Sequence, residues 1–259
     1  MNERHDDHFI EKIAILNLLF KKKLKSALDN MQAEGLTPKE MILSISEIDM
    51  FKELQDIGLT ADLKEFVSSY NTSIKEVLTD NASLHSVLSQ NAETLDIIKN
   101  LDVETLLGKA FDFSNLVKKA LVDGLVGGKS IPAIMKDLEA VNLSNTQLNT
   151  VIHTAYDNFG RTVTALAYQD NPEQKFLYGE GRVLGDPTSR ATCQAALLSQ
   201  LENYPDGVTR AQVDEGVYPE IDFIEGGGYN CSHRFYPATE YLVKRQKAQS
   251  EKGLENEGN

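Results

Sequence analysis

The sequence predicts a mainly α-helical protein, with an N-terminal helical bundle or set of helical hairpins followed by a mixed α+β, loop-rich C-terminal module. Two observations support this fold class. From Phe9 to Val163 apolar residues recur every three or four positions, which is the period of an amphipathic helix. Between Asp170 and Pro237 the chain instead contains both cysteines and several turn-forming Asp-Pro, Pro-Asp and Gly-Gly pairs, which favour short strands and ordered loops.

The length of the chain and the positions of its helix-breaking and polar residues predict three parts. With 259 residues the chain can form two modest domains. We expect a helical region at 1–120, the mixed module at 121–240 and a polar tail at 241–259, which offers little to bury. Gly127 and Gly128 interrupt the helical pattern near the first boundary, and we interpret them as a hinge.

The first two expected helices have clear sequence signals. Residues 9–31 carry one apolar stripe, which predicts a long amphipathic helix. Residues 37–40, Thr-Pro-Lys-Glu, supply an N-cap, a proline at the first helical position and a capping-box acid for the second helix, and Gly58 ends it. The stripe of the first helix comprises Phe9, Ile13, Leu16, Phe20, Leu24, Leu28 and Met31.

Further helices follow from the same apolar period. They are expected at 60–78, 84–98, 103–107, 116–126, 130–141 and 144–163. Ser130 is the expected N-cap of the helix that starts near Pro132. Residues 144–147, Ser-Asn-Thr-Gln, form a capping box at the start of the last helix.

Composition excludes several functional classes. The 26 basic and 39 acidic residues give a formal net charge of -13, so the surface as a whole repels phosphate and anionic lipid. We interpret the lysine cluster at 21–25 as a solvated helix face. No apolar run approaches the roughly 20 residues that cross a bilayer, and the N-terminal residues lack the features of a signal peptide. We therefore expect synthesis in the cytoplasm and no membrane partner.

Two sequence features resemble catalytic motifs but do not satisfy them. Residues 124–130 end in Gly-Lys-Ser, yet Asp123 stands where a phosphate-binding loop requires glycine, and a helical pattern precedes it where a strand is needed. Cys193 with His153 or His233 is the one combination for nucleophilic catalysis, and no protease signature surrounds it. We expect neither enzymatic activity nor a cofactor.

The two cysteines leave three alternatives open. Cys193, Cys231 and His233 could bind zinc, with a carboxylate such as Asp186 as the fourth ligand, although no closely spaced Cys-x-x-Cys pair anchors such a site. A Cys193–Cys231 disulfide would form only in an oxidising medium. Two buried free thiols that pack in a core are the commonest state of unpaired cysteines, and this is the interpretation that we favour.

The segments around these cysteines resemble a known family. They read FLYG at 176–179, GDPTSRATC at 185–193 and GGGYNCSHRFYP at 226–237. This pattern is similar to the phage Mu F-type head-morphogenesis module of portal-associated minor capsid proteins, in which an Asp- and Arg-containing turn precedes the first Cys and a Gly-Gly-Tyr-Asn-Cys-like segment closes the domain. With the helical segment at 153–159 included, the resemblance spans roughly residues 121–240. Ser232 stands where that family usually has Arg.

Nine residues form the structural motif that we assign to these segments. They are Asp186, Arg190, Cys193, Gly227, Gly228, Asn230, Cys231, His233 and Pro237. Asp186 before a proline favours a turn, the glycines permit positive φ, and Asn230 tolerates left-handed geometry. Arg190 could pair with Asp186 or with a carbonyl across the loop. We interpret these residues as a scaffold that places the two cysteine segments side by side.

The resemblance implies a structural protein of the bacteriophage virion, a minor capsid protein that is portal-associated and acts in head morphogenesis or viral genome ejection. Its implied partners are the portal protein and other capsid proteins, with packaged DNA as a further contact. Its implied location is the virion, after assembly in the host cytoplasm. The alternative is a toxin- or transferase-type effector enzyme that carries the same module, but the 19 residues after Glu240 are too few for a catalytic domain.

Overall fold

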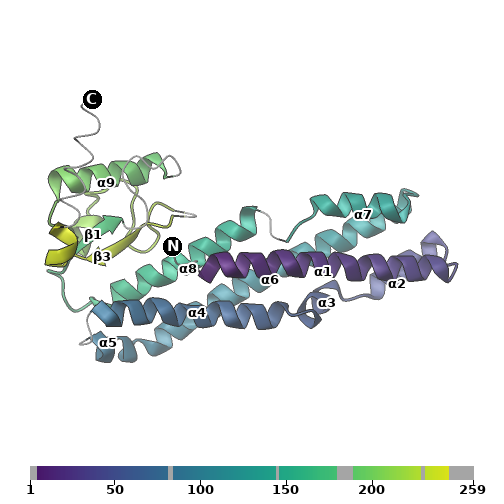
Figure 1. Ribbon diagram of the computed structural model, residues 1–259, viewed down its shortest axis with the longest axis horizontal. Helices are drawn as coiled ribbons and strands as arrows, with labels where there is room; N and C mark the ends of the chain where they lie inside the picture. The colour runs from purple at the N-terminus through teal and green to yellow at the C-terminus, as the bar shows by residue number, and fades with distance from the viewer. Residues whose placement is uncertain (1–4, 81–83, 144–145, 180–188, 229–230, 245–259) are drawn as a thin grey trace. The chain divides into compact units, whose positions relative to one another are not determined.

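The computed structural model describes residues 5–80, 84–143, 146–179, 189–228 and 231–244, and confirms the mainly α-helical class with a mixed C-terminal module (Figure 1). The elements are α1 (His5–Ala33), α2 (Pro38–Glu47), α3 (Met50–Asp56), α4 (Leu59–Asp80), α5 (His85–Gln90), α6 (Ala92–Val126), α7 (Ile131–Ala140), α8 (Thr146–Ala167), β1 (Lys175–Gly179), α9 (Ala191–Asn203), β2 (Val208–Thr209), α10 (Arg210–Asp214) and β3 (Arg234–Pro237). Within the described ranges, none of the helices combines the length and hydropathy that a membrane span requires.

The chain divides into two compact units that share helices. The first unit comprises Met1–Ser69 and Asn100–Ile152, and the second comprises Tyr70–Lys99 and His153–Asn259. Each boundary falls inside a helix, namely α4, α6 or α8. The division at 1–120, 121–240 and 241–259 that the sequence suggests stays a prediction.

The first unit is built around the apolar face of α1, which contacts α3 and α7. Most of the predicted stripe is at most 5% exposed, which confirms the amphipathic helix: Phe9, Ile13, Leu16, Phe20, Leu24 and Leu28. The ring of Phe9 stacks on that of Phe66, with 4.6 Å between their centroids. Phe20 packs against Phe113 of α6, with 5.9 Å between centroids.

The second helix begins as its sequence predicts, but its predicted extension to Gly58 is wrong: α2 ends at Glu47, and Met50–Asp56 form the separate helix α3. The hydroxyl of Thr37 accepts a hydrogen bond from the backbone N–H of Glu40, and the Glu40 carboxylate accepts one from the backbone N–H of Thr37 at 2.8 Å. This capping box satisfies two backbone donors that the first helical turn leaves unpaired. The capping box predicted at 144–147 includes Ser144 and Asn145, which lie outside the described residues.

The expectation of separate helices at 103–107 and 116–126 is wrong, because residues 92–126 form the single helix α6. Glycine inside a helix costs only about 1 kcal/mol, so Gly108 does not end it when one face is packed. The helix ends at Gly127 and Gly128, where the N–H of Lys129 donates to the carbonyl of Gly124 and Gly128 has φ +66°. This is a glycine C-cap. Ser130 then caps α7 through the N–H of Ala133.

Two glycines of α6 provide a matched test of helix packing. A Cβ at Gly124 would lie 2.7 Å from Cγ1 of the buried Ile134 in α7, whereas a Cβ at Gly108 would meet nothing within 4 Å. We expect Gly124→Ala to lower the free energy of unfolding by about 1–2 kcal/mol through overpacking. Gly108→Ala should raise it by up to about 1 kcal/mol through helix propensity. Urea unfolding followed by circular dichroism measures both. A stabilised Gly124→Ala would contradict this packing.

The second unit contains a small antiparallel sheet in the order β2-β1-β3. The central strand β1 pairs Tyr178 with Phe235 of β3 and Phe176 with Val208 of β2. Helix α9 packs against β1 (Figure 1). Aromatic rings fill the core, where Phe223 and Phe235 stack with centroids 4.4 Å apart. The sheet and α9 thereby position the cysteine segments.

Candidate functional site

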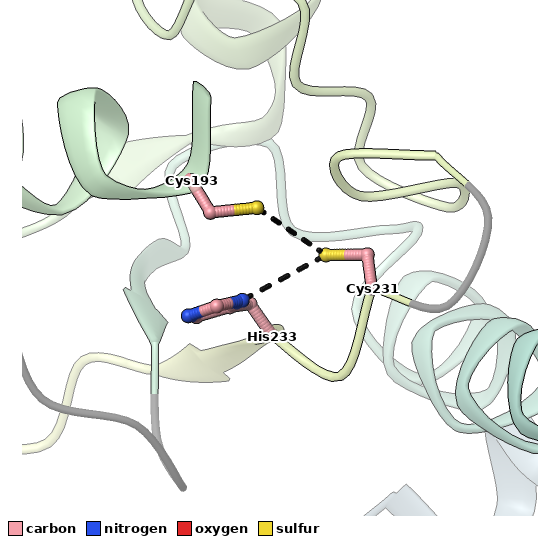
Figure 2. A group of neighbouring side chains, drawn as sticks. All are labelled: Cys193, Cys231 and His233. Carbon is pink, nitrogen blue, oxygen red and sulfur yellow. Dashed lines mark hydrogen bonds between the residues drawn. The ribbon is translucent and has the colours of Figure 1, made fainter. Parts of the chain in front are cut away.

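Three side chains with metal-binding or nucleophilic atoms meet in the core of the second unit (Figure 2). Cys193 lies in the first turn of α9, and Cys231 and His233 lie two residues apart just before β3. Cys193 is 1% exposed, and Cys231 and His233 are each 3% exposed. Residues 38 positions apart in sequence are therefore joined inside one packed core.

The reactive atoms of these side chains lie close together. The Sγ atoms of Cys193 and Cys231 are 3.7 Å apart, and both thiols are free. Cys231 Sγ lies 3.8 Å from Nδ1 of His233. Figure 2 shows the Cys231 sulfur between the Cys193 sulfur and the imidazole ring. The other ring nitrogen of His233, Nε2, is buried and has no hydrogen-bond partner among the described residues.

Tyr178 of β1 covers this cluster. Its hydroxyl donates to Cys193 Sγ at 3.4 Å and lies 3.6 Å from Cys231 Sγ. Its ring stacks on His233, with 5.4 Å between centroids. Burial raises the pKa of Tyr178, so the phenol stays protonated and available as a donor.

The two thiols differ in acidity because they hydrogen-bond to each other. Donation from Cys193 is the largest influence that lowers the pKa of Cys231, and His233 and the backbone N–H of Gly227 act in the same direction. The same bond to Cys231 raises the pKa of Cys193, and burial raises it further. The sulfur of Cys231 is therefore the site where negative charge is best stabilised.

A buried arginine of α8 holds the loop that carries Cys231. Arg161 is 1% exposed, and its Nη1 donates to the carbonyls of Cys231 at 2.9 Å and His233 at 2.6 Å. Its other nitrogens donate to the carbonyls of Ile224 and Glu225. Burial lowers the pKa of Arg161, and the carboxylate of Asp157 opposes that shift. One guanidinium thus ties the backbone on both sides of Gly226–Gly228 to α8.

The glycines beside Cys231 leave room for the sulfurs. A Cβ at Gly227 would lie 2.6 Å from Cys193 Sγ, closer than real Cβ contacts. Gly228 has φ +85°, a left-handed conformation that glycine adopts without strain. Arg190 donates to the carbonyl of Gly227, one of the two partners expected for it.

Gln200 of α9 holds the backbone of Tyr178. Its side-chain oxygen accepts from the backbone N–H of Tyr178 at 2.5 Å and from the Tyr218 hydroxyl at 3.2 Å. Its side-chain nitrogen donates to the carbonyl of Tyr178 at 3.1 Å. Gln200 is fully buried, so it acts as an extra hydrogen-bonding partner for β1.

The structure brings together most of the residues assigned from sequence. Arg190, Cys193, Gly227, Gly228, Cys231 and His233 gather around the two sulfurs. Pro237 instead ends β3, opposite Phe176. Asp186 and Asn230 lie outside the described residues. The sequence analysis did not identify Arg161 and Gln200. The sequence around a polar residue in an amphipathic helix does not show whether that residue is buried.

This arrangement can fasten the loop before β3 to α9, or bind a soft metal ion. The burial of Cys193 and His233 leaves a substrate no direct approach to a thiol nucleophile. No protein-family model, curated protein or solved structure matches the chain. The resemblance described above therefore rests on the cysteine segments themselves.

Proposed function

We propose that the chain is a structural protein of a bacteriophage head, acting at the portal region in head assembly or genome ejection, and not an enzyme. The observation that carries this proposal is the convergence of the two segments that resemble the head-morphogenesis module. Cys193 of the first segment and Cys231 of the second lie side by side in one packed core. Motif residues that hold a core together support a scaffold role.

Burial of the motif favours a structural role over catalysis. The side chains of Cys193, Cys231 and His233 face the protein interior, and the surrounding polar groups of Arg161 and Gln200 bond backbone atoms. In this proposal the protein resides in the virion after assembly in the host cytoplasm. Its partners are the portal protein and other capsid proteins, and packaged DNA is a further contact.

An exposed apolar face on α1 is the proposed contact with the portal protein. Ile15, Leu18 and Leu19 are 57%, 66% and 47% exposed. Their spacing of three and four residues places Ile15 beside the other two on one side of the helix, away from the buried stripe. Exposed apolar side chains grouped in this way are typical of protein interaction sites.

The presence of the chain in particles tests the proposal directly. Mass spectrometry of purified particles from the phage or prophage that encodes it should detect the chain beside the portal protein. Particles made without it should show lower infectivity, with either malformed heads or failed genome delivery. A virion role would be refuted if purified unmodified particles did not contain the chain and particles made without it were fully infectious.

A single charge on α1 should weaken portal binding. We expect Leu18→Lys to lower the affinity of the full chain for the co-encoded portal protein by at least about tenfold, because a charge would be buried where an apolar side chain packed. Leu43→Lys on α2 is the matched control, since Leu43 is 55% exposed in the same unit. Binding is measured by interferometry after circular dichroism has verified folding. Equal affinities of both variants and the unmodified chain would exclude this face.

A further inference from the structure

We propose that Cys193, Cys231 and His233 bind one zinc ion, which fastens the loop before β3 to the first turn of α9. This inference is independent of the proposed phage function. It rests on the positions of the ligand atoms, on the donors that surround the sulfurs and on the charge balance of a buried site.

The spacing of the ligand atoms fits tetrahedral zinc. Zn–S bonds of about 2.3 Å and a Zn–N bond of about 2.0 Å place two sulfurs ~3.8 Å apart and a sulfur and a nitrogen ~3.5 Å apart. The Cys193 and Cys231 sulfurs are 3.7 Å apart, and Cys231 Sγ lies 3.8 Å from His233 Nδ1. All three ligand atoms lie within 4.8 Å of one another. A disulfide would instead require the sulfurs to approach to about 2.0 Å.

The groups around the sulfurs are those that orient metal-bound thiolates. The backbone N–H of Gly227 donates to Cys231 Sγ, and the Tyr178 hydroxyl lies within hydrogen-bonding distance of both sulfurs. Hydrogen-bond donors of this kind fix the direction of metal ligands and are part of the binding site. The absence of a side chain at Gly227 keeps the space beside Cys193 Sγ open.

Zinc also resolves the polarity of the cluster. Without a metal, Nδ1 of the buried His233 imidazole has only a weak contact with the Cys231 sulfur, and zinc would replace that contact with a coordinate bond. Two thiolates and a neutral imidazole around Zn²⁺ sum to zero charge, so the complex can lie in an apolar core at little electrostatic cost. Binding replaces two thiol protons, which pass to solvent, with two Zn–S bonds.

The donor set favours zinc over magnesium and calcium. Thiolate and imidazole are the ligands of zinc, whereas magnesium and calcium require oxygen donors. The trio supplies three of four tetrahedral positions, and the fourth is left to water or another ligand. Because the two sulfurs and the imidazole are almost fully buried, we expect the ion to hold these segments together.

Metal analysis of the full-length chain tests the site. After reduction, zinc loading and dialysis, inductively coupled plasma mass spectrometry should find one zinc per chain. Cobalt should substitute and produce the thiolate-to-metal charge-transfer band of a tetrahedral site. Cys193→Ser and His233→Gln should lose tight binding, while His85→Gln, an exposed histidine of the same unit, should retain it. A cobalt complex without a thiolate band would overturn the proposal.

Thiol chemistry of the unmodified chain decides the question even if a variant fails to fold. Zinc should slow labelling of both cysteines by a disulfide reagent, and a chelator should restore it. Unaltered labelling with zinc, or a non-reduced chain lighter by two hydrogen atoms and free of zinc, would overturn the proposal.

Tyr178 is expected to position the sulfurs. Tyr178→Phe keeps the ring but removes the donor, and it should weaken zinc affinity about 10- to 100-fold. Competition with a chromophoric chelator measures this change, and cobalt spectra of the variant should keep the thiolate band. Unchanged affinity would exclude the hydroxyl from the site.

Discussion

Arg161→Met should destabilise the second unit by about 3–5 kcal/mol. The methionine fills much of the same space but donates no hydrogen bond. The carbonyls of Cys231 and His233 would lose their bonds to the guanidinium, as would those of Ile224 and Glu225. Unpaired acceptors in a core retain the full cost of their desolvation.

The two cysteines report this loss locally, because both are buried in the second unit and the chain contains no others. In the presence of a chelator, labelling of Cys193 and Cys231 should accelerate by more than about a hundredfold in Arg161→Met, in line with the lower free energy of opening. Arg210→Met is the control, since that side chain is 48% exposed, and it should change stability by at most about 0.5 kcal/mol. Labelling of Arg161→Met at the unmodified rate would show that the guanidinium does not hold the loop.

Gln200→Leu is expected to have the second largest effect, a loss of about 2–4 kcal/mol. Leucine is close in size, so packing is largely kept. The backbone N–H and carbonyl of Tyr178 and the hydroxyl of Tyr218 would each lose a bond to the amide. Because Tyr178 also contacts both sulfurs, the change should disturb the cysteine cluster as well.

Near-ultraviolet circular dichroism suits this measurement because the chain has no tryptophan and Tyr178 and Tyr218 are buried in the second unit. Urea unfolding followed at the tyrosine signal should shift to lower denaturant concentration in Gln200→Leu. Gln169→Leu provides the comparison, since Gln169 is exposed in the turn that follows α8. A midpoint equal to that of Gln169→Leu would mean that Tyr178 and Tyr218 find other partners.

Local sequence signals predicted much of the helical architecture. The stripe of α1 repeats every three or four residues, and the caps at Thr37 and Ser130 act within four residues of their helix. The same local reasoning divided α6 wrongly, because a glycine such as Gly108 costs only about 1 kcal/mol inside a helix and does not end it. Asp157 and Arg161 stand four apart, as surface ion pairs do in helices, yet both are buried.

The sequence by itself determined the helical class, the ends of several helices and the two segments that contain the cysteines. Each of these properties depends on residues within one or two helical turns, so it leaves a periodic or capping pattern. Only the tertiary structure decided that Arg161 bonds the carbonyl of Cys231, 70 residues away, and that Gln200 bonds Tyr178, 22 residues away. Such bonds depend on how the chain brings distant backbone groups together. No local sequence pattern identifies the partner of a buried polar side chain.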